Sequence, residues 1–286
     1  MKRFYCLCLL LMVAVMLTGC GENATKAEFF NYIVDTSNNV TITGYTGNEQ
    51  KVIIPSRIAG KKVTAIGEKA FSENNIIVDV TLPNTILSIG DRAFYECSNL
   101  TNISLPEGLT EIGEWAFRKT PLTSIVIPNS VTTIGECAFA GTDLTSVVIP
   151  SKIKVIEDYL FLDCYSLESV SIPEGVAEIG NSAFSDCYRL KEIKLPESLA
   201  TIGLWSFNHC SALESIVIPK NVENISSTAL DNCIRLKTVT ILGMNTEIIL
   251  HGSAYNSINT VITPKGSYAD KYYNEKSGIT VQYIDQ

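Results

Sequence analysis

Hydrophobic and polar residues follow a pattern that repeats every 22 or 23 residues along most of the chain. One unit, LESVSIPEGVAEIGNSAFSDC, begins at Leu167 and shows the pattern L-x-x-V/I-x-I/L-P, x-x-V/L-x-x-I-G, x-x-A-F-x-x-C. The alternation before the proline predicts a short β-strand, and Val176 and Ile179 predict a second short extended segment. Ala183 and Phe184 are expected in a helical or 3₁₀ turn that closes the unit.

Two columns of residues mark the repeat. The proline column is Pro83, Pro106, Pro128, Pro150, Pro173, Pro196 and Pro219, and the phenylalanine column is Phe71, Phe94, Phe117, Phe139, Phe161, Phe184 and Phe207, with Leu230 after it. Proline suits the end of a strand because it has no N–H for the next strand. No unit has enough apolar surface to fold alone, so stacked units sharing one core, a repeat solenoid, are predicted.

These units resemble the BspA-type leucine-rich repeat, the class that includes TpLRR; LTNISLPEGLTEIGEWAF matches its pattern nearly letter for letter. The resemblance covers about residues 28–284. It implies a curved, β-rich leucine-rich repeat solenoid of short β-strands with 3₁₀ or helical turns and with N- and C-terminal caps, on a bacterial surface lipoprotein with interaction or adhesion roles and no catalysis. The repeats are expected at 65–243, the N-terminal cap and first strand at 28–64, and the C-terminal cap at 244–286.

The N-terminus has the pattern of an export signal. Two basic residues precede a short apolar run that closes on LTGC, which resembles the lipobox of bacterial lipoproteins. Residues 1–19 are therefore expected to be a lipoprotein signal peptide, Cys20 the lipidated residue, and residues 20–27 a lipidated tether. An ordinary secretory signal with an incidental cysteine is the alternative.

Charge and motifs limit the classes of function. Without Lys2 and Arg3, 20 basic and 30 acidic residues remain, a formal charge of −10, so nucleic acid is not an expected partner and the membrane is expected to be contacted through the lipid anchor only. The two histidines, His209 and His251, lie in no recurring catalytic pattern. We expect no enzyme activity, no cofactor and no metal site.

Cysteine recurs as C-x-x-L at Cys97, Cys164, Cys187, Cys210 and Cys233, and Thr120 and Thr142 replace it in the two units that lack one residue. A zinc site needs four converging ligands, whereas a column with steps of about 4.8 Å spreads its sulfur atoms along a line. Parallel side chains in register also do not present the dihedral angle of a disulfide. A ladder of buried thiols is the prediction.

Two groups of residues are candidates for binding. The first strand of each unit points alternate residues outward, and these form a candidate protein-binding face of Asn102, Ser104, Ser124, Val126, Ser146, Val148, Ser169, Ser171, Glu192, Lys194, Ser215 and Val217. A candidate aromatic patch for sugar rings or a protein comprises Tyr95, Trp115, Tyr159, Tyr165, Tyr188 and Trp205. The alternatives are that small β-forming residues simply suit a crowded sheet, and that the rings cover the apolar surface of the turns.

Together these patterns predict an exported, lipid-anchored protein facing the cell exterior or envelope. Its expected role is a protein–protein interaction or adhesion surface for host matrix or another bacterial surface protein. Binding of glycan or cell-wall material, and a purely structural role in the cell surface, are the alternatives.

Overall fold

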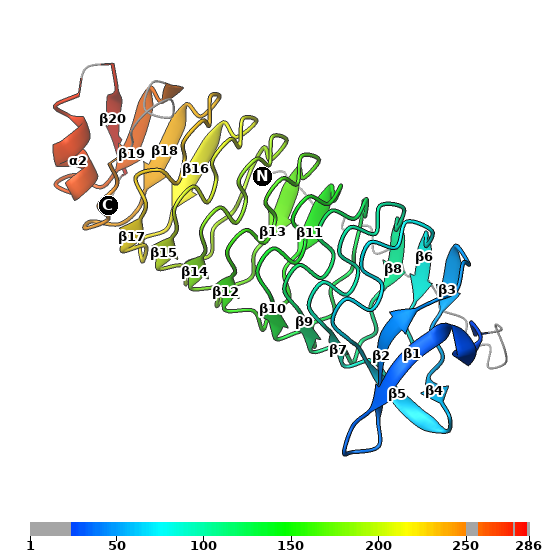
Figure 1. Cartoon of the computed structure of the whole chain (residues 1–286). Coiled ribbons are helices and arrows are strands. Elements are labelled where there is room, and N and C mark those ends of the chain that lie inside the picture. Colours follow the sequence, from blue (N-terminus) through cyan, green and yellow to red (C-terminus); the bar gives the residue numbers. More distant parts are fainter. Residues whose placement is uncertain (1–23, 250–256, 277, 285–286) are drawn as a thin grey trace, which may run out of the picture.

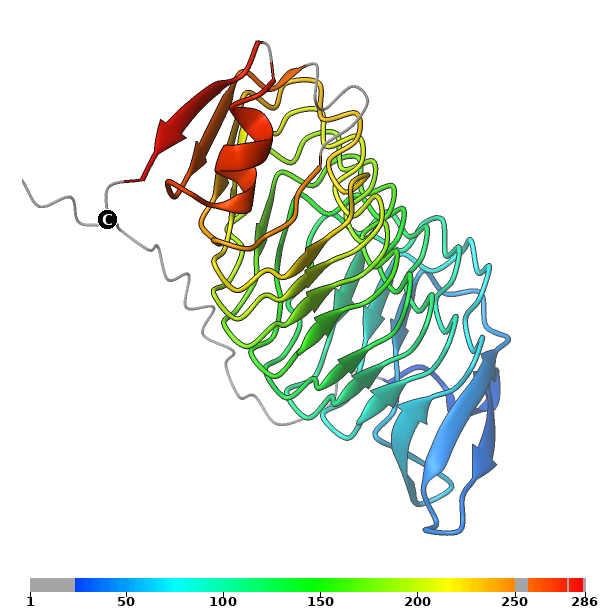
Figure 2. The same ribbon diagram turned by 90° about the vertical axis from the view of Figure 1, so that its left-hand side faces the viewer.

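The computed structural model describes residues 24–249, 257–276 and 278–284. Successive repeats stack side by side into an elongated solenoid (Figure 1). The strands β1–β5 form its N-terminal end, and α2 and β20 lie at the other end. The view turned by 90° shows the same stacking along one axis (Figure 2). The predicted repeat solenoid is confirmed, whereas Cys20 and the expected signal peptide lie outside the described residues.

The first strand of each unit contributes to one column of parallel strands. This first strand column consists of β3 (Lys51–Ile53), β6 (Asp79–Thr81), β8 (Asn102–Ser104), β11 (Ser146–Val148), β13 (Ser169–Ser171), β16 (Ser215–Ile218), β18 (Thr238–Ile241), β19 (Thr260–Thr263) and β20 (Thr280–Tyr283). Hydrogen bonding divides it into β3-β6-β8, β11-β13 and β16-β18-β19-β20. Residues of neighbouring units pair in register, for example Val147 with Val170.

The second extended segment of each unit forms another parallel column. It consists of β2 (Val40–Tyr45), β5 (Lys61–Ile66), β7 (Ser88–Ile89), β9 (Glu111–Ile112), β10 (Thr133–Ile134), β12 (Val155–Ile156), β14 (Glu178–Ile179), β15 (Thr201–Ile202) and β17 (Asn224–Ile225). The column is divided between β10 and β12. Between the two columns each proline begins a turn, as where the amide of Leu109 donates to the carbonyl of Pro106 at 3.0 Å.

The core is one continuous stack of side chains along the axis. The seven rings from Phe71 to Phe207 are at most 2% exposed, and neighbouring centroids lie 5.0–5.8 Å apart with interplanar angles of 3–11°. Leu230 continues the column, also fully buried. Because each ring fills the space beside the next, no unit completes its core without its neighbours.

The turn around each phenylalanine differs from the expected helical or 3₁₀ turn. In one unit the amides of Arg92, Phe94 and Glu96 donate to carbonyls of the next unit at 2.8–2.9 Å, while those of Ala93 and Tyr95 donate to carbonyls three residues earlier. Arg92 and Glu96 both have φ of +54°, and the same two positions are left-handed in most units. Alternate amides thus donate hydrogen bonds to the neighbouring unit, whereas in a helical turn they would bond within their own unit.

The glycine after the second strand allows neighbouring units to approach closely. A Cβ on Gly135 would lie 2.5 Å from the amide nitrogen of Glu114, and one on Gly113 would lie 2.6 Å from that of Asp91. Neither glycine has a left-handed backbone. This agrees with the sequence, where Glu157 and Ser226 occupy the same position in two units. At Gly113 and Gly135, glycine is required by the close approach of the neighbouring backbone rather than by the backbone conformation.

The ends of the solenoid carry additional elements. At the N-terminus η1 (Ala27–Phe29) leads into β1 (Phe30–Val34), which pairs antiparallel with β2, and β4 (Arg57–Ile58) pairs antiparallel with β5. At the C-terminus the helix α2 (Tyr268–Tyr273) is capped by Ser267, whose side chain accepts the amide of Asp270. The part of the chain that the structure describes contains no helix with the length and apolarity that a membrane span requires.

Candidate interaction surfaces

All twelve residues of the candidate protein-binding face are exposed. Eight come from the first strand column, and Ser124, Val126, Glu192 and Lys194 occupy the corresponding positions of two units that form no strand there. We call this surface the sheet face. Val126 and Val148 occupy the same position in adjacent units and are 79% and 67% exposed. Val147, which precedes Val148 in β11, points inward and is 3% exposed. The alternation therefore places the predicted side chains on the surface as expected.

Two shallow grooves hollow the sheet face. One of about 330 Å³ is lined by Val126, Ser146 and Val148 with their strand neighbours. The other, of about 590 Å³, is lined by Ser169, Glu192, Lys194, Ser215 and Val217 among others. Eight of the twelve predicted residues thus line one of these grooves. The sequence located the surface, but it did not indicate the grooves.

The first groove lies where the ladder of the first strand column opens. The segment Ser124–Ile127 forms no strand, and within the described residues the backbone amides of Ile125, Val126 and Ile127 have no hydrogen-bond partner. Just before this segment, the carbonyl of Thr123 accepts a hydrogen bond from the amide of Thr145 in the next unit at 3.2 Å. The ladder of the first strand column is therefore interrupted beside the exposed valines.

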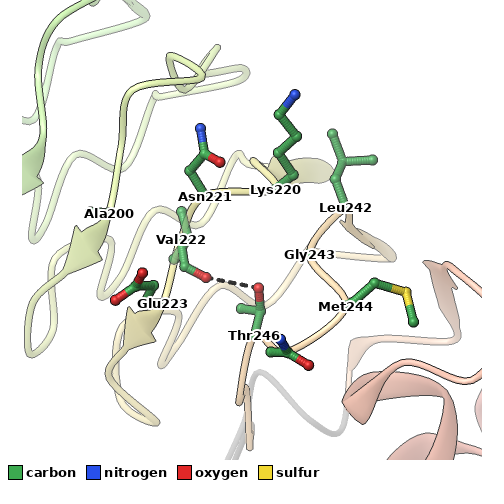
Figure 3. Close-up of a pocket in the computed structure, with 10 residues that line it drawn as sticks. Ala200, Lys220, Asn221, Val222, Glu223, Leu242, Gly243, Met244 and Thr246 are labelled. Carbon is green, nitrogen blue, oxygen red and sulfur yellow. Dashed lines mark hydrogen bonds between the residues drawn. The ribbon is translucent and has the colours of Figure 1, made fainter.

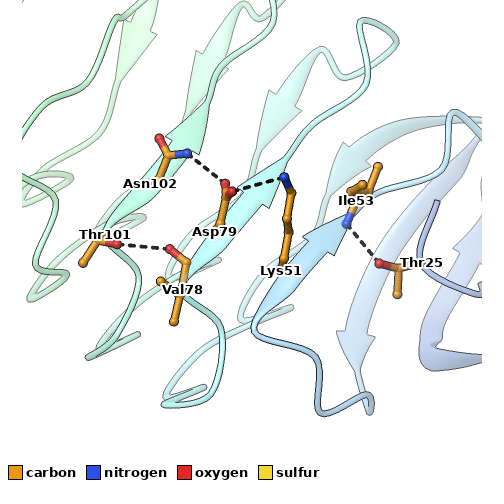
Figure 4. A network of polar contacts seen from close by, with 7 residues as sticks. All are labelled: Thr25, Lys51, Ile53, Val78, Asp79, Thr101 and Asn102. Carbon is orange, nitrogen blue, oxygen red and sulfur yellow. Dashed lines mark hydrogen bonds and ion pairs between the residues drawn. The ribbon is translucent and has the colours of Figure 1, made fainter. Parts of the chain in front are cut away.

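The N-terminal end of the sheet face is occupied by its own polar network. Asn102 donates to Asp79 at 2.9 Å, and Lys51 lies 3.7 Å from the same carboxylate (Figure 4). Beside the C-terminal half, Lys191 pairs with Glu168 at 2.8 Å. The centre, with serines and valines, carries no charge of its own, so it is the part of the face that a partner desolvates most easily.

The aromatic patch consists of two separate ring pairs and two exposed single rings. Tyr165 and Tyr188 stack at 5.3 Å with an interplanar angle of 6°, and their hydroxyls donate to Asp163 and Asp186. The pKa of Tyr188 is raised to about 12, chiefly by the hydrogen bond to Asp186 and secondly by burial.

The other pair, Tyr95 and Trp115, has its centroids 6.0 Å apart. The guanidinium groups of Arg118 and Arg92 lie 4.3 and 5.2 Å from the centre of the Trp115 ring. Tyr159 and Trp205 are 38% and 48% exposed. In the pair of Tyr95 and Trp115, the Tyr95 hydroxyl also donates to a carboxylate, that of Glu96, at 2.7 Å. The guanidinium groups over Trp115 are therefore what distinguishes this pair from the tyrosine pair.

The cysteines of the C-x-x-L column are fully buried free thiols. Each donates to the carbonyl of the phenylalanine one unit earlier, as Cys97 does to Phe71 at 2.9 Å and Cys164 to Phe139 at 3.2 Å. Burial raises the pKa of Cys97 to about 12 and that of Cys164 to about 11. The predicted ladder of buried thiols is confirmed. Thr142, in a shortened unit, instead bonds to the carbonyl of Phe139 in its own unit at 2.8 Å.

A further pocket, of about 780 Å³, lies at the corner between the two strand columns near the C-terminal end (Figure 3). Lys220 to Glu223 and Leu242 to Thr246 line most of it, and the hydroxyl of Thr246 donates to the carbonyl of Val222 at 2.8 Å. None of the predicted site residues lies there. Sequence comparison between units could have indicated it, because the segment after Ile241 departs from the repeat.

Comparisons with known proteins agree with this architecture. The chain matches the family described as BspA type Leucine rich repeat region in six copies, over residues 48–143 and 132–261. The T. pallidum leucine-rich repeat protein TpLRR is 36% identical, with a TM-score of 0.63, and the match covers 66% of this chain and 90% of that one.

A leucine-rich repeat protein from Bacteroides ovatus has the same fold, with a TM-score of 0.66 at 23% identity over 89% of this chain and 75% of that one. Comparison with curated proteins gave no match. No enzyme family is indicated, and the described residues contain no group of three or more histidines, cysteines or carboxylates placed to hold a metal ion. The chain belongs to the BspA-type leucine-rich repeat family.

Proposed function

We propose that this protein is a lipid-anchored adhesion scaffold at the cell surface, which binds another protein through the centre of its sheet face. The observation that carries the proposal is the pair Val126 and Val148, which are exposed on adjacent units and line one groove. Repeat solenoids commonly bind partners along such extended surfaces. Exposed apolar side chains grouped in one place also mark interaction sites.

The chemistry of this surface suits a protein partner. Full burial of one valine side chain contributes about 1.5–3 kcal/mol, and two neighbouring valines could anchor an interface. The exposed serine hydroxyls, such as that of Ser146, can donate to backbone carbonyls of the partner. The uncharged centre avoids the cost of desolvating a charge.

The test is a binding measurement with residues 21–286 against host matrix proteins, bacterial cells and cell-wall material. We expect saturable binding to a protein, lost in the double variant Val126→Glu with Val148→Glu. Leu87→Glu and Ile234→Glu, which also change exposed apolar residues but lie off the sheet face, should retain it. Unchanged binding in the double variant would show that a different surface is used.

Lipid anchoring through Cys20 is the second part of the proposal. It is supported by the LTGC motif at the end of the apolar run. Because Thr25 is hydrogen-bonded to Ile53 of β3, only the stretch from Cys20 to Thr25 can extend as a tether, by no more than about 18 Å, so the N-terminal cap would lie close to the membrane. Cells expressing the wild type should incorporate labelled palmitate and cells expressing Cys20→Ala should not; equal label in both would disprove the anchor.

Glycan binding is a second candidate function, favoured by the stacked pair Tyr165 and Tyr188 with its carboxylates. Aromatic rings combined with acceptors for hydroxyl groups suit sugars. A glycan array probed with the wild type, Tyr188→Ala and Trp115→Ala tests it. Binding to the array that these variants abolish would favour this function, and an array without signal would exclude it.

A further inference from the structure

The N-terminal end of the solenoid has two sheet edges that are treated differently. In the first strand column the edge of β3 is covered, because Thr25 donates its amide to the carbonyl of Ile53 at 2.9 Å and its hydroxyl accepts the amide of Ile53 at 3.0 Å (Figure 4). In the other sheet the outermost strand is β1, which pairs with β2 on one side only among the described strands. Its second edge is open.

The composition of β1 is unusual for an open edge. Its sequence is FNYIV, without charge or proline, and Tyr32, Ile33 and Val34 are 38%, 59% and 43% exposed. Natural edge strands are normally protected by lysine, proline or a bulge that turns the edge away. β1 has neither lysine nor proline, and the one register shift of the β1–β2 pair, between Asn31 and Tyr32, places the extra residue on β2. The short edge strand β4, by contrast, carries Arg57. An apolar, uncharged edge of this kind is suited to pairing with another strand.

The hydrogen-bond pattern shows which groups of β1 face outward. The amide of Asp35 donates to the carbonyl of Asn39, and the carbonyl of Phe29 accepts the amide of Thr46. Because main-chain groups alternate along an antiparallel strand, the odd-numbered residues of β1 face β2. The amides and carbonyls of Phe30, Tyr32 and Val34 therefore point to the open edge.

A second copy of the same strand complements this edge. In a two-fold antiparallel pairing centred on Tyr32, Phe30 lies opposite Val34 of the second copy, so all three outward residues find partners. Asp35 would then face Phe29, and Glu28 would face Thr36, so no like charges oppose each other. A two-fold contact also closes on itself and does not grow into a fibre.

We propose that two copies of this protein associate through their β1 strands, forming one sheet that continues across the two-fold axis. A single strand pair buries less than the roughly 1,200 Å² typical of stable interfaces, so the association in solution is weak. If Cys20 is anchored as proposed, the short tether holds every N-terminal cap at the same height, which raises the effective concentration of the edges. The pairing itself does not depend on the anchor.

Cysteine cross-linking tests both the contact and its register. Residues 21–286 contain every element that the structure describes, and their six native thiols are at most 5% exposed. In Tyr32→Cys the two new thiols lie across the axis, with Cα atoms about 5.5 Å apart, within disulfide range. In the matched variant Val34→Cys the two lie about 13 Å apart along the strands. We expect covalent dimer to form at least tenfold faster with Tyr32→Cys.

Lysine variants separate this contact from the sheet face. In sedimentation experiments and on lipid vesicles, Val34→Lys should abolish self-association, whereas Val126→Lys, the same change on the sheet face, should leave it intact. Val34→Lys should also retain binding of a protein partner. Failure of the proposed function would leave the cross-linking unchanged, so the two results are distinguishable.

Three outcomes would overturn the proposal. The first is equal cross-linking of the two cysteine variants. The second is the absence of cross-linking and of self-association both in solution and on vesicles. The third is that unlipidated wild-type protein binds phospholipid vesicles without self-association and that Val34→Lys abolishes this binding. That result would assign β1 to the membrane surface instead.

Discussion

The thiol of Cys187 donates a hydrogen bond at 3.3 Å to the carbonyl of Phe161, which lies one unit earlier in the chain. The same relationship joins Cys210 to Phe184 and Cys233 to Phe207, at 3.3 and 3.1 Å. These thiols therefore link neighbouring units as well as filling the core.

Replacement of Cys187 by alanine tests this link. The variant loses a buried sulfur atom and one of the hydrogen bonds to the Phe161 carbonyl, so the free energy of unfolding in urea should fall by about 1–2 kcal/mol. Cys187→Thr should lose less, because Thr142 shows that a hydroxyl at this position can bond within its own unit. Equal losses would mean that a hydroxyl at this position does not replace the hydrogen bond of the thiol.

The raised thiol pKa values predict a loss of stability at high pH. A thiol whose pKa is about 9 in the unfolded chain and higher in the folded protein gives its full stabilisation below pH 9. This stabilisation is lost as the pH rises through the pKa of the folded state, which is about 12 for Cys97 and Cys233. Each such thiol contributes a slope of about 1.4 kcal/mol per pH unit. Cys187→Thr should therefore reduce the fall in unfolding free energy between pH 8 and pH 10; an identical fall would contradict the prediction.

Glycine replacement distinguishes positions of close approach from ordinary turns. In Gly135→Ala the new methyl group would lie 2.5 Å from the amide nitrogen of Glu114, and we expect a loss of about 1–3 kcal/mol in unfolding free energy. Gly108→Ala meets nothing closer than 3.6 Å and should be neutral or slightly stabilising. Urea titration followed by circular dichroism gives both values, and similar effects would show that the units can separate locally.

The left-handed turn positions predict a preference for glycine over β-branched residues. Glu73 has φ of +60° and an exposed side chain. Glu73→Gly should be as stable as the wild type or more so, and Glu73→Val should be less stable than Glu73→Gly by about 1–2 kcal/mol. The melting temperature of the three proteins orders them; equal values for glycine and valine would exclude a left-handed backbone at this position.

The periodic columns were predictable because each column repeats one physical requirement. Phe117 and Phe139 must fill the same space in neighbouring units, and Val126 must point away from the core because Ile125 and Ile127 point toward it. A single sequence that contains eight near-copies of a unit therefore carries most of the information that an alignment would supply.

Other features depend on how one unit meets the next. The left-handed residues Arg92 and Trp115 are not types that favour positive φ, and their conformation follows from amides committed to the next unit. The open ladder at Ser124 to Ile127 follows the shortened connection that contains Pro121, and no local pattern indicates how the strand responds. The exposure of Ile33 depends on β1 being the outermost of the strands that the structure describes.

The phenylalanine stack has a consequence for how this protein can change over evolution. Every step along it, such as the 5.5 Å between Phe117 and Phe139, has similar ring contacts, and the amide of each phenylalanine donates to a carbonyl of the next unit. Duplication or loss of one 22- or 23-residue unit would therefore leave both ends intact and alter only the length of the molecule. The distance between the two ends is adjustable in increments of a single repeat.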